Sequence, residues 1–193
     1  MRLFSYVVAR DYGFAPNPFF GTCTLATCKP DIRKAANIDD WVIGTGSKSR
    51  HRGNRMVFAM RVTEFMEFND YWADSRFKAK KPYLAGSKKL AFGDNIYFKS
   101  GGRWRQENSH HSLANGKPNM ANVAHDTRVD RVLVSSDFVY WGREGPAIPR
   151  SLHRVRKRGP GHRCDFDDVF IGKVTSWLRS FSEWGYVGEP LDW

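Results

Sequence analysis

The densest group of polar and chemically versatile side chains lies between residues 104 and 126. Two adjacent histidines, His110 and His111, are followed by a third, His125, and by the acid Asp126. Histidine and carboxylate side chains are typical ligands of zinc and iron. Asn, Gln, Ser and neutral His can instead read the hydrogen-bonding edges of nucleobases, on which a nearby aromatic ring can stack. A third interpretation is a polar surface loop held by its own side-chain hydrogen bonds.

The spacing of the histidines favours the base pocket over the metal site. The sequence contains no HxxxH that a helix would align and no HxH that a strand would align. Adjacent histidines in an extended segment point to opposite sides. We therefore expect no metal and no other cofactor. The residues predicted to line a base pocket are Trp41, Thr45, Ser47, Trp104, Gln106, Ser109 and His110.

A catalytic interpretation remains open as the second hypothesis. In it His110, His111, His125 and Asp126 serve an enzyme that acts on a base or nucleotide, as acid–base groups or metal ligands. The cysteines support catalysis less, because Cys23 and Cys28 fall in a predicted strand and at its end, where a buried cysteine usually serves as a small apolar side chain. Sequence distance from the histidines does not exclude contact in space. No GxSxG motif occurs.

The positive charge of the chain is concentrated in loops. The sequence has 31 Lys and Arg against 20 Asp and Glu, a net charge of +11. Runs without any acid cover residues 46–61, 76–89 and 150–163, and acids outnumber bases in the rest of the chain. Flexible cationic loops suit phosphate contact and counterion release. The residues predicted to bind phosphate are Lys48, Arg50, Arg52, Arg154, Arg156, Lys157 and Arg158.

This charge distribution makes nucleic acid the expected partner. The alternatives are a basic module that binds an acidic protein and charge runs that are merely solvated. The apolar runs are too short to cross a membrane, and no membrane partner is expected. The three cysteines lack CxxC spacing, which indicates a reducing compartment, so we expect a cytoplasmic protein.

The elements that must position these residues are mostly strands. The length of 193 residues predicts one domain over residues 1–193. A basic loop over residues 146–164 leads to a predicted amphipathic helix at about 166–184, whose apolar residues repeat at three- and four-residue intervals. Because strands outnumber helices without βαβ alternation, the sequence predicts an α+β class with a curved or closed sheet. Strands are predicted at residues 3–9, 22–27, 41–43, 56–65, 94–99 and 131–141, and a short helix at 30–36.

Several segments resemble a known family. They are residues 5–19 (SYVVARDYGFAPNPF), 39–47 (DDWVIGTGS), 104–112 (WRQENSHHS) and 132–142 (VLVSSDFVYWG). Together they are similar to the second of the nucleotide-modification-associated domain families, and the resemblance spans most of the chain. It implies a part in DNA base hypermodification, and it supplies no catalytic residues.

A second resemblance concerns residues 32–43 and 57–74. Their order of short helix, strand and amphipathic strand before an aromatic and acidic turn resembles the PUA-like superfamily of ASCH, EVE and YTH domains, although Asp39 stands where those domains usually have Gly. The resemblance implies a small curved sheet or pseudo-barrel with short peripheral helices and a nucleobase pocket. We therefore expect a DNA-binding, PUA-like domain that recognises a modified base or takes part in producing one.

Overall fold

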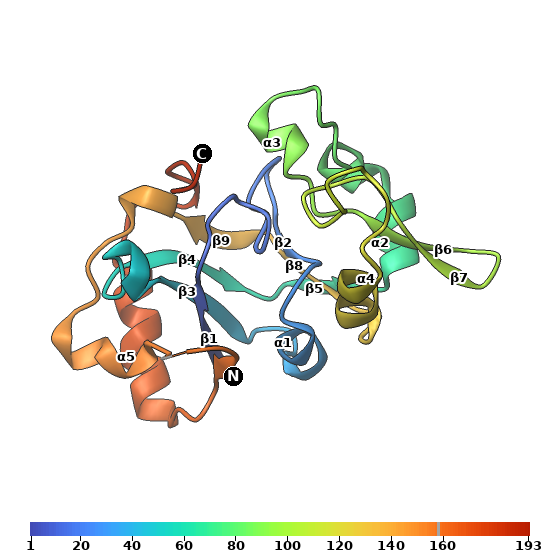
Figure 1. Cartoon of the computed structure of the whole chain (residues 1–193). Coiled ribbons are helices and arrows are strands. Elements are labelled where there is room, and N and C mark those ends of the chain that lie inside the picture. Colours follow the sequence, from blue (N-terminus) through green and yellow to red (C-terminus); the bar gives the residue numbers. More distant parts are fainter. Residues whose placement is uncertain (158) are drawn as a thin grey trace.

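The computed structural model of the chain describes residues 1–157 and 159–193 (Figure 1). The predicted phosphate-binding residue Arg158 lies outside the described residues, as does the side chain of Arg50. The architecture is mixed α/β with several sheets. No helix within the described ranges combines the length and apolar character needed to cross a bilayer.

The largest sheet has six strands within the described residues, in the order β10-β1-β3-β4-β9-β11. The pairs β1–β3 and β9–β11 are parallel, and the other neighbours are antiparallel. Its strands alternate apolar side chains between two faces that are both covered, which is why they contain few polar residues. The strands are β1 (Leu3–Val8), β3 (Trp41–Gly46), β4 (Met56–Arg61), β9 (Asp137–Tyr140), β10 (His162–Arg163) and β11 (Gly185–Tyr186).

A second, three-stranded sheet lies beside the first and has the order β2-β8-β5. The predicted strand 131–141 divides at Ser136, so that its first half joins this sheet and its second half joins the larger one. The predicted strand 56–65 divides in the same way near Thr63, whose hydroxyl accepts a hydrogen bond from the Ser136 amide at 3.1 Å. The strands are β2 (Cys23–Leu25), β5 (Glu64–Met66) and β8 (Val132–Ser135).

The prediction of a pseudo-barrel is wrong for the part of the chain that is described. The six-stranded sheet ends in β10 on one side and β11 on the other, and these two short strands do not pair. The physical reason is the division of the two long predicted strands. Each crosses from one sheet to the other instead of extending the first sheet far enough to close it.

The helices lie at the outer layers. Helix α5 (Asp168–Arg179), shorter than the predicted 166–184, covers one face of the six-stranded sheet with Phe170, Ile171, Val174 and Leu178. A second apolar cluster fills the space between the two sheets. A third lies beyond the three-stranded sheet, under α2, α4 and the hairpin β6–β7. The remaining helices are α1 (Pro30–Ala35), α2 (Phe68–Ala73), α3 (Lys88–Ala91) and α4 (Met120–Thr127), with 3-10 turns η1 (Lys48–Arg50), η2 (Ser75–Lys80), η3 (Gly142–Glu144) and η4 (Arg150–Val155).

Candidate active site

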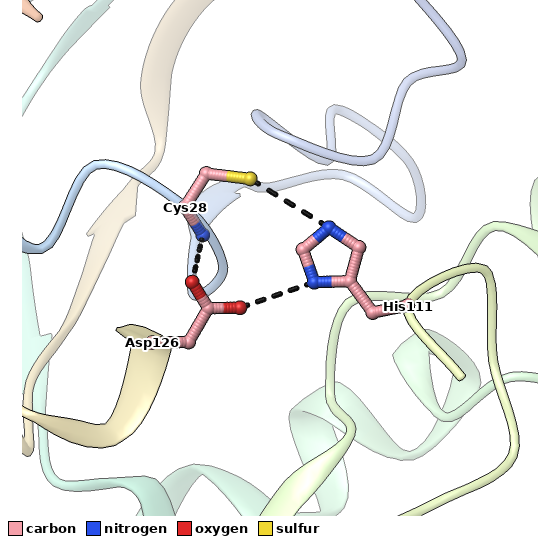
Figure 2. A group of neighbouring side chains, drawn as sticks. All are labelled: Cys28, His111 and Asp126. Carbon is pink, nitrogen blue, oxygen red and sulfur yellow. Dashed lines mark hydrogen bonds and ion pairs between the residues drawn. The ribbon is translucent and has the colours of Figure 1, made fainter. Parts of the chain in front are cut away.

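Three side chains from distant parts of the sequence meet near the helices α1 and α4 (Figure 2). The Cys28 Sγ lies 3.7 Å from Nε2 of His111. The other ring nitrogen of His111, Nδ1, lies 3.1 Å from Oδ2 of Asp126. The imidazole thus stands between a thiol and a carboxylate and uses a different nitrogen for each, which is the arrangement of an activated nucleophile with its base and its orienting acid.

Cys28 occupies a tight turn between β2 and α1. Its backbone has a φ of 56° and that of Lys29 a φ of 41°, so two consecutive residues other than glycine adopt the left-handed conformation. Such a conformation costs about 1–2 kcal/mol per residue and persists where surrounding bonds impose it. Here the amide of Cys28 donates to Oδ1 of Asp126 at 2.8 Å. A sharp strand-to-helix turn is also how other folds expose a nucleophile.

The buried side chain of Arg33 ties Cys28 and Asp126 together. It is 0% exposed, and its Nε donates to the carbonyl of Cys28 at 3.1 Å. Its two other nitrogens donate to the main-chain carbonyls of Asp126, Val129 and Arg131. One planar guanidinium therefore fixes both the turn that carries the thiol and the end of the helix that carries the carboxylate.

The Asp126 carboxylate can be buried because hydrogen bonds replace the water around its charge. Oδ1 accepts from the amide of Cys28 and faces Nδ1 of His125 at 3.1 Å. Oδ2 accepts from the Tyr97 hydroxyl at 2.9 Å and faces Nδ1 of His111. A carboxylate has about four lone-pair sites, and described residues occupy all of them. The carboxylate is thereby held as an anion in an apolar environment.

Hydrogen bonds from neighbouring side chains to the main chain of His111 hold this residue in place. Its carbonyl accepts from Nε2 of Gln106 at 3.3 Å and from Nδ2 of Asn122 at 2.9 Å. Its amide donates to Oγ of Ser109 at 3.3 Å. The ring lies 4.6 Å from the ring of Phe14, measured between centroids. Polar residues of the 104–126 region thus serve to orient this imidazole.

The electrostatics of the site favour a protonated His111. Burial acts to lower the pKa of its imidazole, but the hydrogen bonds and charges of Asp126 and Cys28 outweigh burial and raise the pKa to about 9. For Asp126, burial acts to raise the pKa of the carboxyl, and the hydrogen bonds from His111, His125 and Tyr97 bring it below its usual range. At neutral pH the site therefore holds an imidazolium beside a carboxylate.

The same three residues could also hold a metal ion, since ligand atoms of Cys28, His111 and Asp126 lie within 4.8 Å of one another. The hydrogen bonds argue against this use. Each oxygen of Asp126 already has two partners, and Nδ1 of His111 is occupied by the carboxylate. A metal would have to displace one of these partners, whereas proton transfer between Cys28 and His111 needs no rearrangement.

The structure brings together most of the residues predicted for the catalytic hypothesis. His111 and Asp126 are in direct contact, and His125 binds the same carboxylate with a side chain that is 56% exposed. The ring of His110 lies beside that of His111, with 6.2 Å between centroids, and contacts those of Tyr12, Phe14 and Phe92. The expectation that these adjacent histidines point to opposite sides is therefore wrong.

The residues predicted for a base pocket lie in different places. Gln106 and Ser109 support His111, as described above. Trp104 packs against Phe68, and Lys99 lies over its ring. Of the other three, Trp41 and Thr45 belong to β3, and Ser47 follows it. Trp41 packs beneath α5, Thr45 Oγ1 donates to the Tyr6 carbonyl at 3.5 Å, and the Ser47 hydroxyl accepts from the Ser49 amide.

The described phosphate-binding candidates lie at two adjacent loops. Lys48 is in η1, and the Arg52 guanidinium donates to the Arg143 carbonyl. The stretch after η3 pairs with that loop through a bridge between Arg55 and Ala147. Arg154 pairs with Asp167, and the Nε of Arg156 donates to the His153 carbonyl. Lys157 also has an interaction partner.

The sequence prediction missed the contact of Cys28 with His111. This contact joins residues that are 83 positions apart, and no local pattern encodes it. One signal was available. Cys28 ends a predicted strand two residues before Pro30, which begins a helix, and a strand–turn–helix with a potential nucleophile at the turn is typical of catalytic sites.

Comparison with known proteins places the chain in a family. No curated protein and no solved structure matches it significantly. A family model described as nucleotide modification associated domain 2 matches residues 1–193, the whole chain. The resemblance seen in the four sequence segments is thereby confirmed. The chain belongs to the nucleotide modification associated domain 2 family.

Proposed function

We propose that this protein is an enzyme of nucleotide modification in which Cys28 is the nucleophile. The observation that carries the proposal is the position of the His111 imidazole, with Nε2 at 3.7 Å from the thiol and Nδ1 at 3.1 Å from a buried carboxylate. Membership of a nucleotide-modification family supplies the context. In this site His111 carries the proton and Asp126 is a positioning residue.

The proposed reaction is acyl transfer. One proton is shared between the Cys28 Sγ and Nε2 of His111, and with that proton on Nε2 the sulfur attacks the acyl carbon of the substrate. The imidazolium returns the proton to the leaving group, and a thioester forms on Cys28. Water or an amine then attacks the thioester and gives a proton to Nε2 of His111, the bond between carbon and sulfur breaks, and the acyl product leaves while the starting pair of Cys28 and His111 is restored. A proton carrier beside the nucleophile suits an acyl carbon, because the departing group needs that proton.

The proposal is tested first by the reactivity of Cys28. Iodoacetamide should alkylate Cys28 faster than Cys164 at pH 7, as measured by mass spectrometry of the derived peptides. Cys164 is the matched control, since both cysteines are partly buried and accessibility alone would not separate them. His111→Gln should bring the Cys28 rate down to that of Cys164. Equal rates in the wild-type protein would overturn the assignment of Cys28 as the nucleophile.

The second test follows the acyl group. Wild-type protein treated with p-nitrophenyl acetate should release one equivalent of p-nitrophenolate in a burst and carry the acetyl group on Cys28. A 5′-nucleotide with an acylated base amine should then lose its acyl group with turnover, and Cys28→Ser should abolish both reactions. Acetylation at lysines only, with no effect of Cys28→Ser, would contradict the proposal.

A metal-dependent enzyme is the second candidate, because three ligand atoms lie within 4.8 Å of one another. Elemental analysis of the purified protein separates the two. Stoichiometric zinc or iron that is lost in Cys28→Ser would favour the metal site over the nucleophile.

The prediction of DNA binding through the basic loops, and with it the PUA-like resemblance, stays a prediction. It is supported by the net charge of +11. Arg154 and Arg52 already bond to groups of their own chain, so their contribution to phosphate binding would require them to share or exchange partners. Arg154→Ala combined with Arg156→Ala should weaken salt-dependent DNA binding if these loops hold phosphates.

A further inference from the structure

The proposed acyl transfer places a negative charge on the acyl oxygen of the substrate. As the Cys28 sulfur attacks the acyl carbon, the π-electron pair of the carbonyl moves to its oxygen, and it returns when the leaving group departs. Donors that face this oxyanion supply much of the catalysis in such reactions, and removing one of them costs about 100- to 1000-fold in kcat. The candidate active site therefore needs a donor for the oxyanion.

Most donors around the triad already have acceptors among the described residues. Figure 2 shows the amide of Cys28 bonded to the carboxylate of Asp126. Pro30, two positions later, has no amide hydrogen. The turn that carries the thiol therefore leaves Lys29, between these two residues, as a donor. The other side chains with acceptors are those of Arg33, Asn122, Tyr97 in β6 (Tyr97–Ser100) and Gln106 in β7 (Arg103–Gln106).

The ammonium of Lys29 has no oxygen acceptor within the described part of the chain. Its Nζ lies 4.8 Å from the centroid of the Tyr6 ring. The nearest acid along the chain, Asp31, binds Arg128 at 2.8 Å instead. Burial lowers the pKa of Lys29, and the charge of Cys28 acts in the opposite direction. The ammonium is thus partly buried, close enough to Cys28 to respond to its charge, and not neutralised.

The buried lysine Lys80 shows what is missing at Lys29. Burial lowers the pKa of Lys80 to about 8. Its Nζ donates to the carbonyl and Oδ1 of Asn17, at 3.0 and 2.7 Å, and to the Thr22 carbonyl at 3.0 Å. These oxygens replace the water that Lys80 has lost, whereas Lys29 contacts one aromatic ring. A partly dehydrated ammonium gains more from an anion than an exposed ammonium does, because less water screens its charge.

Contacts at both ends hold the Lys29 side chain near the triad. At its main chain, Lys29 belongs to the turn of Cys28 and has a φ of 41°. At its tip, the ring of Tyr6 lies beside Nζ, and the Tyr6 hydroxyl donates to the Ala15 carbonyl at 3.0 Å. The residue before Ala15 is Phe14, whose ring lies 4.6 Å from that of His111. The ammonium is therefore tied both to the nucleophile and to the loop that packs against its base.

We propose that Lys29 is a catalytic residue whose ammonium binds the acyl oxygen of the substrate while that oxygen is negative. His111 carries the proton of the reaction, whereas Nζ of Lys29 keeps its three protons throughout and supplies charge and a hydrogen bond. The oxyanion forms on attack by Cys28 and collapses as the bond to the leaving group breaks. This role deepens the proposed function and rests on it, since no oxyanion arises without that attack.

The test compares two reactions of Cys28 in Lys29→Met, which keeps an apolar side chain and removes the charge. Acetylation by p-nitrophenyl acetate passes through an oxyanion, so the burst of p-nitrophenolate should be about 100-fold slower than in the wild-type protein. Alkylation by iodoacetamide displaces iodide from a saturated carbon and forms no oxyanion. Its rate, measured where it no longer depends on pH, should stay at the wild-type value, which also shows that the triad is intact.

Two further variants serve as controls. Lys34→Met changes an exposed lysine of the same helix, α1, and is the matched control. It should change neither reaction. Lys29→Arg keeps the positive charge, so its burst should be faster than that of Lys29→Met, and equal losses would overturn the role of the charge.

Three other outcomes would overturn the role of Lys29. The first is an unchanged burst in Lys29→Met. The second is a burst and an alkylation slowed by the same factor, which would mean that Lys29 only positions Cys28. The third is an acetyl group that passes from Cys28 to Lys29, which would make the amine an acyl acceptor. No burst in the wild-type protein would refute the acyl transfer itself, and with it this role, whereas the first three outcomes leave the acyl transfer standing.

Discussion

Asp126 accepts hydrogen bonds from the Cys28 amide and the Tyr97 hydroxyl while both neighbouring histidines face its remaining lone pairs. Its side chain is 1% exposed. Removing water from a carboxylate costs several kcal/mol unless protein donors replace the lost solvation. The four partners provide that replacement, and they also fix the ring of His111 so that Nε2 points at the thiol. Stability and geometry at this site therefore depend on the same bonds.

Replacing this carboxylate by an amide should lower the stability of the fold and disturb the geometry of the site. In Asp126→Asn an NH₂ group would face donors of the Cys28 turn or of His111, and each unsatisfied buried group costs about 1–3 kcal/mol. We expect the free energy of unfolding to fall by about 3 kcal/mol, with slower alkylation of Cys28 at pH 7. Urea denaturation followed by tryptophan fluorescence measures the first effect. Asp31→Asn, at an exposed ion pair with Arg128, is the control, and an equal loss there would refute the explanation.

The pKa of His111 predicts how stability changes with pH. The pKa is raised to about 9 in the folded chain, above about 6.5 in the unfolded chain, so the folded state binds the proton more tightly. This contribution is fully present below about pH 6.5 and is lost as the pH rises through about 9. The difference in unfolding free energy between the wild-type protein and His111→Gln should therefore be larger at pH 6 than at pH 9.5.

Cys28→Ala provides the matched control for this pH dependence. Burial lowers the pKa of His111, and the hydrogen bond with Cys28 raises it, after that with Asp126. The double variant Cys28→Ala with His111→Gln should also differ from Cys28→Ala alone in its free energy of unfolding. This difference should depend less on pH than the difference between wild type and His111→Gln. A difference between wild type and His111→Gln that grows with pH would contradict the assigned direction.

At the scale of elements, the site depends on the junction of the short helices α1 and α4. The last carbonyls of any helix lack partners within the helix. Arg33 in α1 supplies a donor to the Asp126 carbonyl near the end of α4 and to the carbonyls of Val129 and Arg131 beyond it. Because the same guanidinium binds the Cys28 carbonyl, a change at Arg33 should disturb the triad without touching any of its side chains.

Arg33→Lys tests that role. An ammonium group lacks the planar fork of donors that reaches several carbonyls at once, so several buried acceptors should lose their partner. We expect the free energy of unfolding to fall by about 3 kcal/mol and Cys28 alkylation at pH 7 to slow. Arg128→Lys is the matched control, since Arg128 is exposed and pairs with Asp31 at the surface, and it should change stability by less than about 1 kcal/mol. A similarly small change at Arg33 would show that the bonds to the carbonyls contribute little.

Elements were easier to predict from the sequence than the contacts between them. The strand at 3–8 and the helix beginning at Pro30 follow from local apolar runs and from proline at a first helical turn. The division of the strand at 131–141 was missed, because both halves alternate in the same way and the bend at Ser136 depends on a partner 73 residues away. His111 and Asp126 were recognised by type. The contact between Cys28 and His111 was not predicted, because it joins residues 83 positions apart.

At the scale of the whole molecule, the last residues of the chain bind the loop that follows β1, near the candidate active site. The amide of Asp11 donates to the Asp192 carboxylate at 2.6 Å, and Nε1 of Trp193 donates to the carbonyl of Tyr12 at 2.9 Å. The segment that they secure, residues 10–21, carries Phe14, whose ring contacts that of His111. Contacts of the last residues should therefore hold the wall of the site in place.

Trp193→Ala should loosen that wall selectively. The variant removes a hydrogen bond to Tyr12 and a ring 5.5 Å from that of Phe19, a loss of about 1 kcal/mol. If the loss falls on local opening, amide hydrogen exchange over residues 12–20 should accelerate about fivefold, as measured by mass spectrometry. Trp177→Ala is the matched control, because Trp177 belongs to α5 and packs in the apolar cluster between that helix and the six-stranded sheet. It should lower global stability without a selective effect on residues 12–20, and equal acceleration in both variants would mean that the last residues do not specifically secure this segment.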